Sequence, residues 1–319
     1  MSAACRVCGA PGPHPALVAR EMMYGTRERF EYFACAVCGC LQIAHVPADL
    51  SAYYPADYYS FGAEAPGPLR RLAKRQRLRH ALGLPSLGGA LLTRRYGAPY
   101  VGRWLAPLRP ALDSRILDVG SGAGHVLFEL RDAGFTSLTG ADPYAPDEVD
   151  SGGVRILQQS IHEVEGTFDL VMLHHTFEHL ADPAETLASA ERLLRSGGQV
   201  LLRIPVADSY AFRTYGAAWV QLDAPRHLFL HTRDSIGRLA AGAGLEVRAV
   251  TCDSSAFGLW GSEQYRQDIA LRDPRSYEVD PAASPFSPAD VEAFERQAAA
   301  LNRAGHGDQA CFTLARPAR

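Results

Sequence analysis

The chain has 319 residues, of which 47% are hydrophobic and 21% are charged. This balance is that of a globular protein, and it excludes an intrinsically disordered chain or a fibrous repeat. The formal net charge of −3 at pH 7 argues against whole-surface attraction to nucleic acid or to an acidic membrane. The sequence has no apolar run near the ~18 residues that span a bilayer and no leader-like start, so a cytoplasmic location is expected.

Five of the seven cysteines lie in the first forty residues. Cys5-Arg-Val-Cys8-Gly9 and Cys35-Ala-Val-Cys38-Gly39 are two copies of a C-x-x-C-G turn, and each copy presents two thiolates to one point. Two such turns complete a tetrahedral zinc site. The sequence therefore predicts a structural zinc site, against the alternatives of disulfides, a redox pair or a metal-free cluster, and we expect Cys40 in the apolar core. The predicted ligands are Cys5, Cys8, Cys35 and Cys38.

Composition divides the chain into three parts. Residues 1–60 hold the ribbon and an aromatic strap (50–59), which we expect mainly to pack against another surface. Residues 61–112 form a basic helical linker, because residues 65–112 carry ten Arg and Lys and no Asp or Glu. Leucines interleave with these basic residues, as in a basic amphipathic helix. A solvated helix face is one interpretation, and contact with a phosphate-bearing substrate, an anionic lipid head group or RNA is the alternative.

From residue 113 to residue 319, short apolar runs alternate with helical periodicity. This alternation predicts a mostly parallel sheet covered by helices on both faces, with ligands bound beyond the carboxyl ends of its strands. Thr232 is a predicted helix N-cap. Helices are predicted at 126–133, 183–194, 232–243 and 289–303. Seven strands are predicted, at 116–119, 137–141, 154–157, 168–173, 199–204, 245–250 and 310–314.

The first of these strands runs into Asp118-Val-Gly120-Ser121-Gly122-Ala-Gly124 and then into a helix. Glycines let the backbone approach a ligand closely, and the helix N-terminus offers free amide donors, so the segment predicts a nucleotide cradle. A dinucleotide fingerprint would need glycine at position 125, which is His125, and no P-loop motif occurs. These departures weaken an NAD site and exclude a P-loop.

The segment resembles the D-x-G-x-G-x-G motif of class I S-adenosylmethionine-dependent methyltransferases. In that family a carboxylate at the end of the second strand accepts both ribose hydroxyls, and Asp142 occupies this place. The resemblance implies a Rossmann-like sheet of seven strands, ending in an antiparallel hairpin, with helices on both faces. It also implies S-adenosylmethionine as the methyl donor. Ser160 and Ile161 are expected near adenine, and His174 near the methionine part. The other residues expected to bind the donor are Asp118, Gly120, Ser121, Gly122, Gly124 and Asp142.

Three later segments extend the resemblance. Residues 168–183 look like the fourth-strand signature of many of these enzymes, and 194–198 look like the turn before the fifth strand. Residues 222–229, followed by Thr232, resemble the subgroup called the methyltransferase type 23 domain. The early ribbon with its tyrosine-rich strap is similar to members in glycan and natural-product biosynthesis.

The sulfonium donor is already electrophilic, so the protein must align donor and acceptor and often remove a proton. His227 and His179 are the candidate general bases, against structural roles for each. Some ubiquinone-pathway O-methyltransferases bind a divalent cation through Glu-x-x-Glu-His at this place. Here Glu178 and His179 match but His175 replaces the first carboxylate, so catalytic magnesium is not predicted.

A long insertion, roughly residues 253–308, is expected to form a lid or a substrate wall. The favoured hypothesis is methylation of a hydroxyl on a sugar or another small biosynthetic acceptor. A sugar C-methyltransferase is the close alternative. An RNA methyltransferase that uses the ribbon and the basic segment is a further alternative. It is disfavoured, and nucleic acid is not expected as a partner, because no aromatic residues interleave with the basic residues of the patch. A non-catalytic binding protein is disfavoured by the intact glycines. Peripheral membrane contact through the basic segment stays open.

Overall fold

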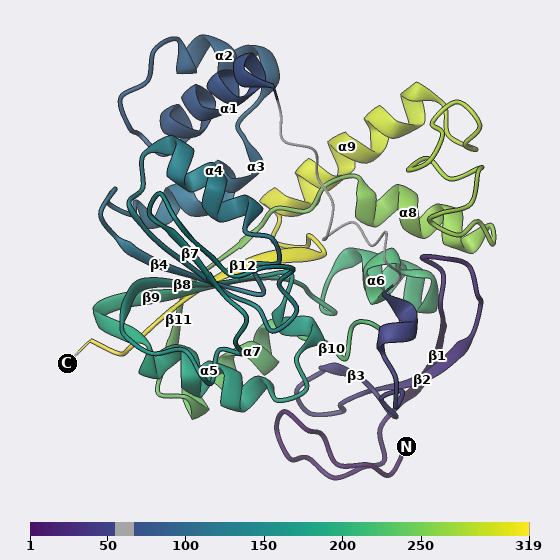
Figure 1. The fold of residues 1–319 in the computed structure, drawn as a ribbon. Coiled ribbons are helices and arrows are strands. Elements are labelled where there is room, and N and C mark those ends of the chain that lie inside the picture. The colour runs from purple at the N-terminus through teal and green to yellow at the C-terminus, as the bar shows by residue number, and fades with distance from the viewer. Residues whose placement is uncertain (55–66, 319) are drawn as a thin grey trace. The chain divides into compact units, whose positions relative to one another are not determined.

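The computed structural model describes residues 1–54 and 67–318 (Figure 1). The chain forms two compact units. We call Met1–Tyr53, His175–Ala188 and Leu202–Arg319 the ribbon unit. Tyr54–His174 and Ser189–Leu201 form the glycine-loop unit.

A four-stranded antiparallel sheet in the ribbon unit joins the N-terminal segment to a distant part of the chain. Its order is β1-β2-β3-β10. The strands are β1 (Ala16–Arg20), β2 (Arg29–Ala34), β3 (Leu41–Ile43) and β10 (Phe229–Leu230). Phe229 pairs with Gln42, and Leu230 pairs with Leu41. The N-terminal ribbon therefore shares its sheet with residues that follow the predicted base His227.

One apolar core underlies this sheet. The cysteines of both C-x-x-C turns pack in it together with side chains from residues 207–230, among them Trp219 and Leu228. Cys40 is fully buried in the same core, as expected. Because a small ribbon buries little surface alone, the shared core supplies burial that its own residues lack.

The large sheet has eight strands in the order β11-β12-β9-β8-β4-β5-β7-β6. All seven predicted strands are present, and the antiparallel β11–β12 hairpin closes the series. The predicted count of seven was one short because β6 adds a short edge strand antiparallel to β7. β6 was missed because its sequence Val-Asp-Ser lacks an apolar run. The strands are β4 (Arg115–Val119), β5 (Ser137–Ala141), β6 (Val149–Ser151), β7 (Val154–Leu157), β8 (Phe168–His174), β9 (Leu194–Pro205), β11 (Glu246–Cys252) and β12 (Gln309–Ala315).

Strands β5 and β8 lie on either side of β4, and both run parallel to it. β7 runs parallel to β5 in turn. The carboxyl ends of these strands therefore share one edge of the sheet, where the glycine turn, Asp142 and His174 are found. This is the α/β fold class that the sequence predicts, with a mostly parallel sheet.

The helices of the glycine-loop unit begin with the basic segment. α1 packs against α2, α3 and α4, and α4 in turn packs against β5 and β7. The helices are α1 (Pro68–Ala81), α2 (Gly89–Tyr96), α3 (Tyr100–Leu105), the 3-10 turn η2 (Ala106–Leu108) and α4 (His125–Ala133).

The remaining helices include α8 and α9, which lie in the predicted insertion. Thr232 caps α7 by accepting a hydrogen bond from the Ser235 amide, as predicted. These elements are η1 (Ser51–Tyr53), η3 (Phe177–His179), α5 (Pro183–Arg192), α6 (Tyr210–Tyr215), η4 (Gly216–Ala218), η5 (Val220–Leu222), α7 (Arg233–Gly242), α8 (Phe257–Arg266) and α9 (Pro288–Arg303).

Several expectations about organisation stay predictions. These are the domain boundaries at 60 and 112 and the role of the insertion as a lid. Tyr58 and Tyr59 of the strap lie outside the described residues, whereas Tyr53 packs edge-on against Phe30 of the ribbon. No helix in the described ranges is both long and apolar enough to cross a membrane.

Candidate active site

The predicted glycine turn lies between β4 and α4. Gly120, Gly122 and Gly124 have φ angles of 74°, 52° and 79°. These left-handed values favour glycine over any residue with a Cβ. A Cβ on Gly124 would also collide with the Ile156 side chain, so the tight turn requires glycine there on two counts.

The Asp142 carboxylate faces this turn. One of its oxygens accepts the Gly122 amide at 2.8 Å, and the other accepts the Tyr144 amide at 2.8 Å. Asp118 is buried at the end of β4, and burial together with the nearby Asp142 charge raises its pKa to about 7. Two backbone amides therefore fix the orientation of the Asp142 carboxylate.

The other predicted cofactor residues follow neighbouring strands of the same unit. Ile161 is buried, and Ser160 hydrogen-bonds Glu163 through both its amide and its hydroxyl. His174 ends β8, and its ring packs against Tyr100 and Trp104 from α3 at centroid distances of 5.3 and 5.2 Å. The Ser121 hydroxyl is buried and has no hydrogen-bond partner among the described residues.

Both candidate bases lie beside Glu178 in the ribbon unit. One donor atom each from Glu178, His179 and His227 lies within 4.8 Å of the others. The His227 Nε2 atom is 4.0 Å from a Glu178 oxygen and 4.0 Å from an Asp223 oxygen. The two imidazoles meet edge to face with their centroids 4.7 Å apart. We call Glu178, His179, His227 and Asp223 the histidine cluster.

Backbone carbonyls set the tautomers of both histidines. The His179 Nδ1–H donates to the Arg226 carbonyl at 2.9 Å, and the His227 Nδ1–H donates to the Gln221 carbonyl at 2.8 Å. In the neutral imidazole of His227 the lone pair is therefore on Nε2, the atom that lies 4.0 Å from each of the two carboxylates. Burial, followed by the neighbouring His227, lowers the pKa of His179.

Glu178 is fully buried and ionised. Burial raises its pKa, but the hydrogen bond from His175 and the charges of the nearby histidines outweigh burial and lower that pKa to about 2. One Glu178 oxygen has no hydrogen-bond partner among the described residues. The cluster therefore presents an anionic oxygen and two oriented imidazoles, a set that could also bind a metal ion.

His175 holds Glu178 of the cluster in position. Its Nδ1 lies 3.2 Å from Glu178, while its Nε2 lies 2.7 Å from Arg203 and 2.6 Å from Gln309. Because both nitrogens have partners, His175 positions Glu178 and does not replace the missing carboxylate of the ubiquinone-pathway motif as a ligand.

A buried cation anchors the loop that carries His227. The Arg226 guanidinium is fully buried and contacts Asp223 at 2.6 Å and Glu21 at 2.9 Å, and it also donates to the Tyr53 carbonyl. The Tyr32 hydroxyl donates to the His227 carbonyl at 2.9 Å. The N-terminal segment therefore holds both residues of the Arg226–His227 pair.

The four predicted zinc ligands come together. The Cys5 and Cys38 sulfurs are 3.7 Å apart, and the Cys8 and Cys35 sulfurs are 3.6 Å apart. Tetrahedral zinc with bonds of about 2.3 Å separates its sulfurs by about 3.8 Å, whereas a disulfide needs about 2.05 Å. The Cys5 sulfur accepts hydrogen bonds from the Gln42 side chain and from two backbone amides of its own turn. The Cys35 sulfur accepts two from the backbone amides of the other turn. The residues present fit zinc and not a disulfide.

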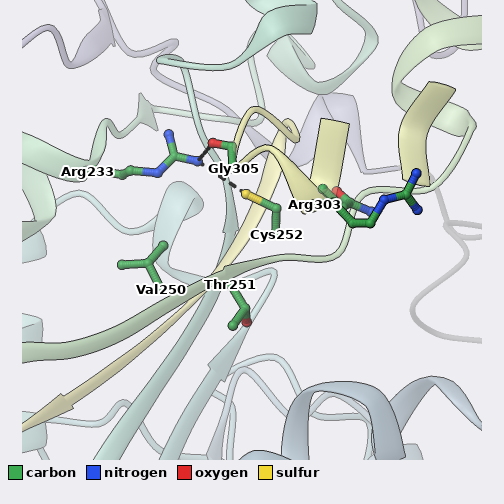
Figure 2. Close-up of a pocket in the computed structure, with 7 residues that line it drawn as sticks. Arg233, Val250, Thr251, Cys252, Arg303 and Gly305 are labelled. Carbon is green, nitrogen blue, oxygen red and sulfur yellow. Dashed lines mark hydrogen bonds between the residues drawn. The ribbon is translucent and has the colours of Figure 1, made fainter. Parts of the chain in front are cut away.

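A separate pocket opens where β11 meets the end of α9 (Figure 2). Its lining contains none of the predicted site residues. Arg233 crosses it to the Gly305 carbonyl at 2.8 Å and the Cys252 sulfur at 3.2 Å, and its charge is balanced by Asp208 at 2.8 Å. The guanidinium therefore has its partners within the fold, and we assign the pocket no role in the reaction.

Residues 93–250 match the family described as a methyltransferase domain. Ubiquinone biosynthesis O-methyltransferase from Pseudomonas aeruginosa (strain LESB58) is 30% identical over 168 residues, covering 46% of this chain and 71% of that protein. The chain belongs to the S-adenosylmethionine-dependent methyltransferases. The ubiquinone biosynthesis O-methyltransferase from Thiobacillus denitrificans (strain ATCC 25259 / T1) is 26% identical over 167 residues. The match covers 47% of this methyltransferase and 72% of that one.

Among solved structures, the cyclopropane synthase MmaA2 from Mycobacterium tuberculosis is similar at 18% identity and a TM-score of 0.40. The match covers 64% of this methyltransferase and 78% of that chain. A likeness of this degree carries no information on the acceptor.

The candidate site contains residues that the sequence did not point to. Glu21, Tyr32 and Arg203 were not singled out, and they act on the cluster from distant parts of the chain. Asp223 and Arg226 lie within the segment 222–229 that resembles the family, but no role was predicted for them. The Asp-x-x-Arg-His spacing was the one local signal, since it places three polar side chains around a single turn.

We expect Arg226→Ala to destabilise the methyltransferase by about 3 to 5 kcal/mol, because it leaves Glu21 and Asp223 buried without their cation. Denaturant unfolding followed by circular dichroism measures the change. Arg296→Ala is the matched control, since Arg296 pairs with Glu292 on the surface and should matter little. A loss no larger than the control's would contradict a buried anchoring role for Arg226.

Proposed function

We propose that this methyltransferase transfers a methyl group to a hydroxyl oxygen of a small biosynthetic acceptor, such as a sugar, with His227 as the proton acceptor. The observation that carries the proposal is the orientation of His227, whose Nε2 atom lies 4.0 Å from a carboxylate oxygen of Glu178 and 4.0 Å from one of Asp223. The relatives named as O-methyltransferases support oxygen as the acceptor atom.

For the donor, we propose that the glycine turn and Asp142 bind S-adenosylmethionine, with Ser160 and Ile161 near adenine and His174 near the methionine part. The turn fits such a ligand because its three glycines leave the backbone open to close approach and because the buried Ser121 hydroxyl has no partner among the described residues. Each Asp142 oxygen accepts one amide and keeps a second lone pair for a ribose hydroxyl.

When bound, S-adenosylmethionine supplies an electrophilic methyl group, so the remaining task is to bind and deprotonate the acceptor. His227 Nε2 would accept the proton of the acceptor hydroxyl, and the donor, when bound, would supply the methyl group and leave as S-adenosylhomocysteine. The resulting imidazolium lies between the Glu178 and Asp223 carboxylates, which stabilise its positive charge. The Gln221 carbonyl keeps the imidazole in the reactive tautomer throughout. His179, with its lowered pKa, is the second candidate, and its ring lies 4.7 Å from that of His227.

The short separation in sequence supports assigning the cluster and the donor residues to the same reaction. His174 ends β8, and Glu178 and His179 follow within five residues. Ligands in open α/β sheets bind beyond the carboxyl ends of the strands, which is where this segment begins.

We expect His227→Ala to lower turnover by about a hundredfold or more while leaving affinity for S-adenosylhomocysteine unchanged. Acceptors are first found by screening sugars and other hydroxyl compounds with methyl-labelled donor, and NMR of the product identifies an O-methyl or C-methyl group. Calorimetry then measures affinity for S-adenosylhomocysteine.

His45→Ala is the matched control, since His45 is exposed outside the cluster. Equal losses of turnover and affinity in His227→Ala would assign it a structural role. If dialysed enzyme regained activity only on addition of a divalent cation, the cluster would be a metal site and not a general base. A C-methyl product would favour the alternative activity.

We also propose that Cys5, Cys8, Cys35 and Cys38 hold one structural zinc ion. Four thiolates leave no open position on tetrahedral zinc, so the ion contributes to folding and takes no part in the chemistry. It would fix the two turns that flank β1 and β2.

We expect the purified protein to contain one zinc per chain by elemental analysis. Cys8→Ser should lose the ion and melt at a lower temperature, because the two turns then lack their common ligand. Cys252→Ser, outside the ribbon, should keep both the zinc and the melting temperature. If the wild-type protein contained no zinc and a chelator did not change its melting temperature, the proposed zinc site would be contradicted.

A further inference from the structure

The basic segment carries an apolar surface that the fold leaves uncovered. Leu69 and Leu72 on α1 are 81% and 50% exposed, and Leu87 and Leu91 are 87% and 73% exposed. Scattered single leucines on a surface are ordinary, but four within 23 residues of a strongly basic segment are not. We call this set the leucine surface.

The inner face of α1 explains how the helix is held. Leu78 is fully buried, and Arg71 and Lys74 pair with Asp132 and Glu129 of α4. Leu69 lies nine residues before Leu78, which places it on the opposite side of the helix. The leucine surface is therefore not a frayed end of the core but the outer face of an anchored helix.

A hydrogen bond brings Leu87 to the same face. Its backbone amide donates to the Gln76 side chain at 2.8 Å, and Gln76 lies one turn after Leu72 on α1. α1 and α2 pack side by side (Figure 1). Leu91 follows one turn after Leu87, at the start of α2.

Unneutralised positive charge surrounds these leucines. Of the ten basic residues in the segment, only Arg71 and Lys74 form ion pairs with carboxylates of described residues. Arg70, Arg75 and Arg94 are exposed and belong to none of these pairs. Since the whole chain carries −3, the rest of the molecule is strongly acidic, and the segment is the part that an anionic surface would attract.

We propose that the α1–α2 leucine surface docks peripherally on an anionic phospholipid bilayer. Exposed leucines flanked by arginines match a membrane interface, where side chains enter the acyl boundary and guanidinium groups meet lipid phosphates. RNA would use the charge but would leave the leucines exposed to water. Single-stranded RNA sites instead carry stacking aromatics, and only Tyr96 and Tyr100 of this segment are exposed aromatics.

Vesicle flotation of the full chain tests the proposal. We expect binding at physiological salt to vesicles of phosphatidylcholine with phosphatidylglycerol and not to phosphatidylcholine alone. The triple variant Leu69→Gln, Leu72→Gln, Leu87→Gln should partition at least about tenfold more weakly, as should Arg70→Gln, Arg75→Gln, Arg94→Gln. Val279→Gln and Arg296→Gln are matched controls on exposed residues of the ribbon unit and should bind as wild type.

Circular dichroism and thermal melting establish that each variant is folded. If the leucine variant bound the vesicles as well as the wild type, and only the arginine variant lost binding, the surface would be a charge patch alone. That result would overturn the proposal. Absence of vesicle binding by the wild type, with salt-sensitive binding of single-stranded RNA in its place, would overturn it in favour of nucleic acid. The proposal is independent of the acceptor, so these results leave the proposed methyl transfer untouched.

Discussion

The orientation of the Asp142 carboxylate is the constraint on which the functional account rests. Two backbone amides hold its oxygens, and one of these amides belongs to a glycine of the turn that follows β4. Asp118, buried next to it, has a pKa raised to about 7 by burial and by the Asp142 charge, so the pair shares less than two negative charges at neutral pH. An oriented carboxylate beside a glycine-rich turn suits a ligand with paired hydroxyls and no pyrophosphate.

Arg226 has the corresponding role in the ribbon unit. Its burial makes its two carboxylate partners obligatory, and one of them, Glu21, comes from the N-terminal segment. Together with the Tyr32 hydroxyl and the pairing of β3 with β10, this contact makes the cysteine ribbon part of the structure that orients His227. The ribbon is therefore more than an appendage, because its sheet and core end on the residues next to His227.

Local sequence spacing predicted much of the molecule. The C-x-x-C-G turns and the glycine turn were identified because each is specified by a few adjacent residues, and the strands because each is an apolar run. Edge strand β6 was missed because Val149–Ser151 has no such run. The contacts that orient the histidines could not be predicted, since Glu21 and Arg226 are 205 residues apart and Tyr32 and His227 are 195 apart. No periodicity relates such pairs, and only the fold brings them together.

Calorimetry of S-adenosylhomocysteine binding to wild-type protein and to Asp142→Asn tests the central claim most directly. Asparagine preserves size and one acceptor oxygen, so the Gly122 amide keeps a partner while the charge and the second ribose acceptor are lost. The account predicts that affinity falls by at least about tenfold in a folded variant. The exposed Asp150→Asn change on β6 should have no effect. Equal affinity of wild type and Asp142→Asn, or no binding by the wild type at all, would contradict the account.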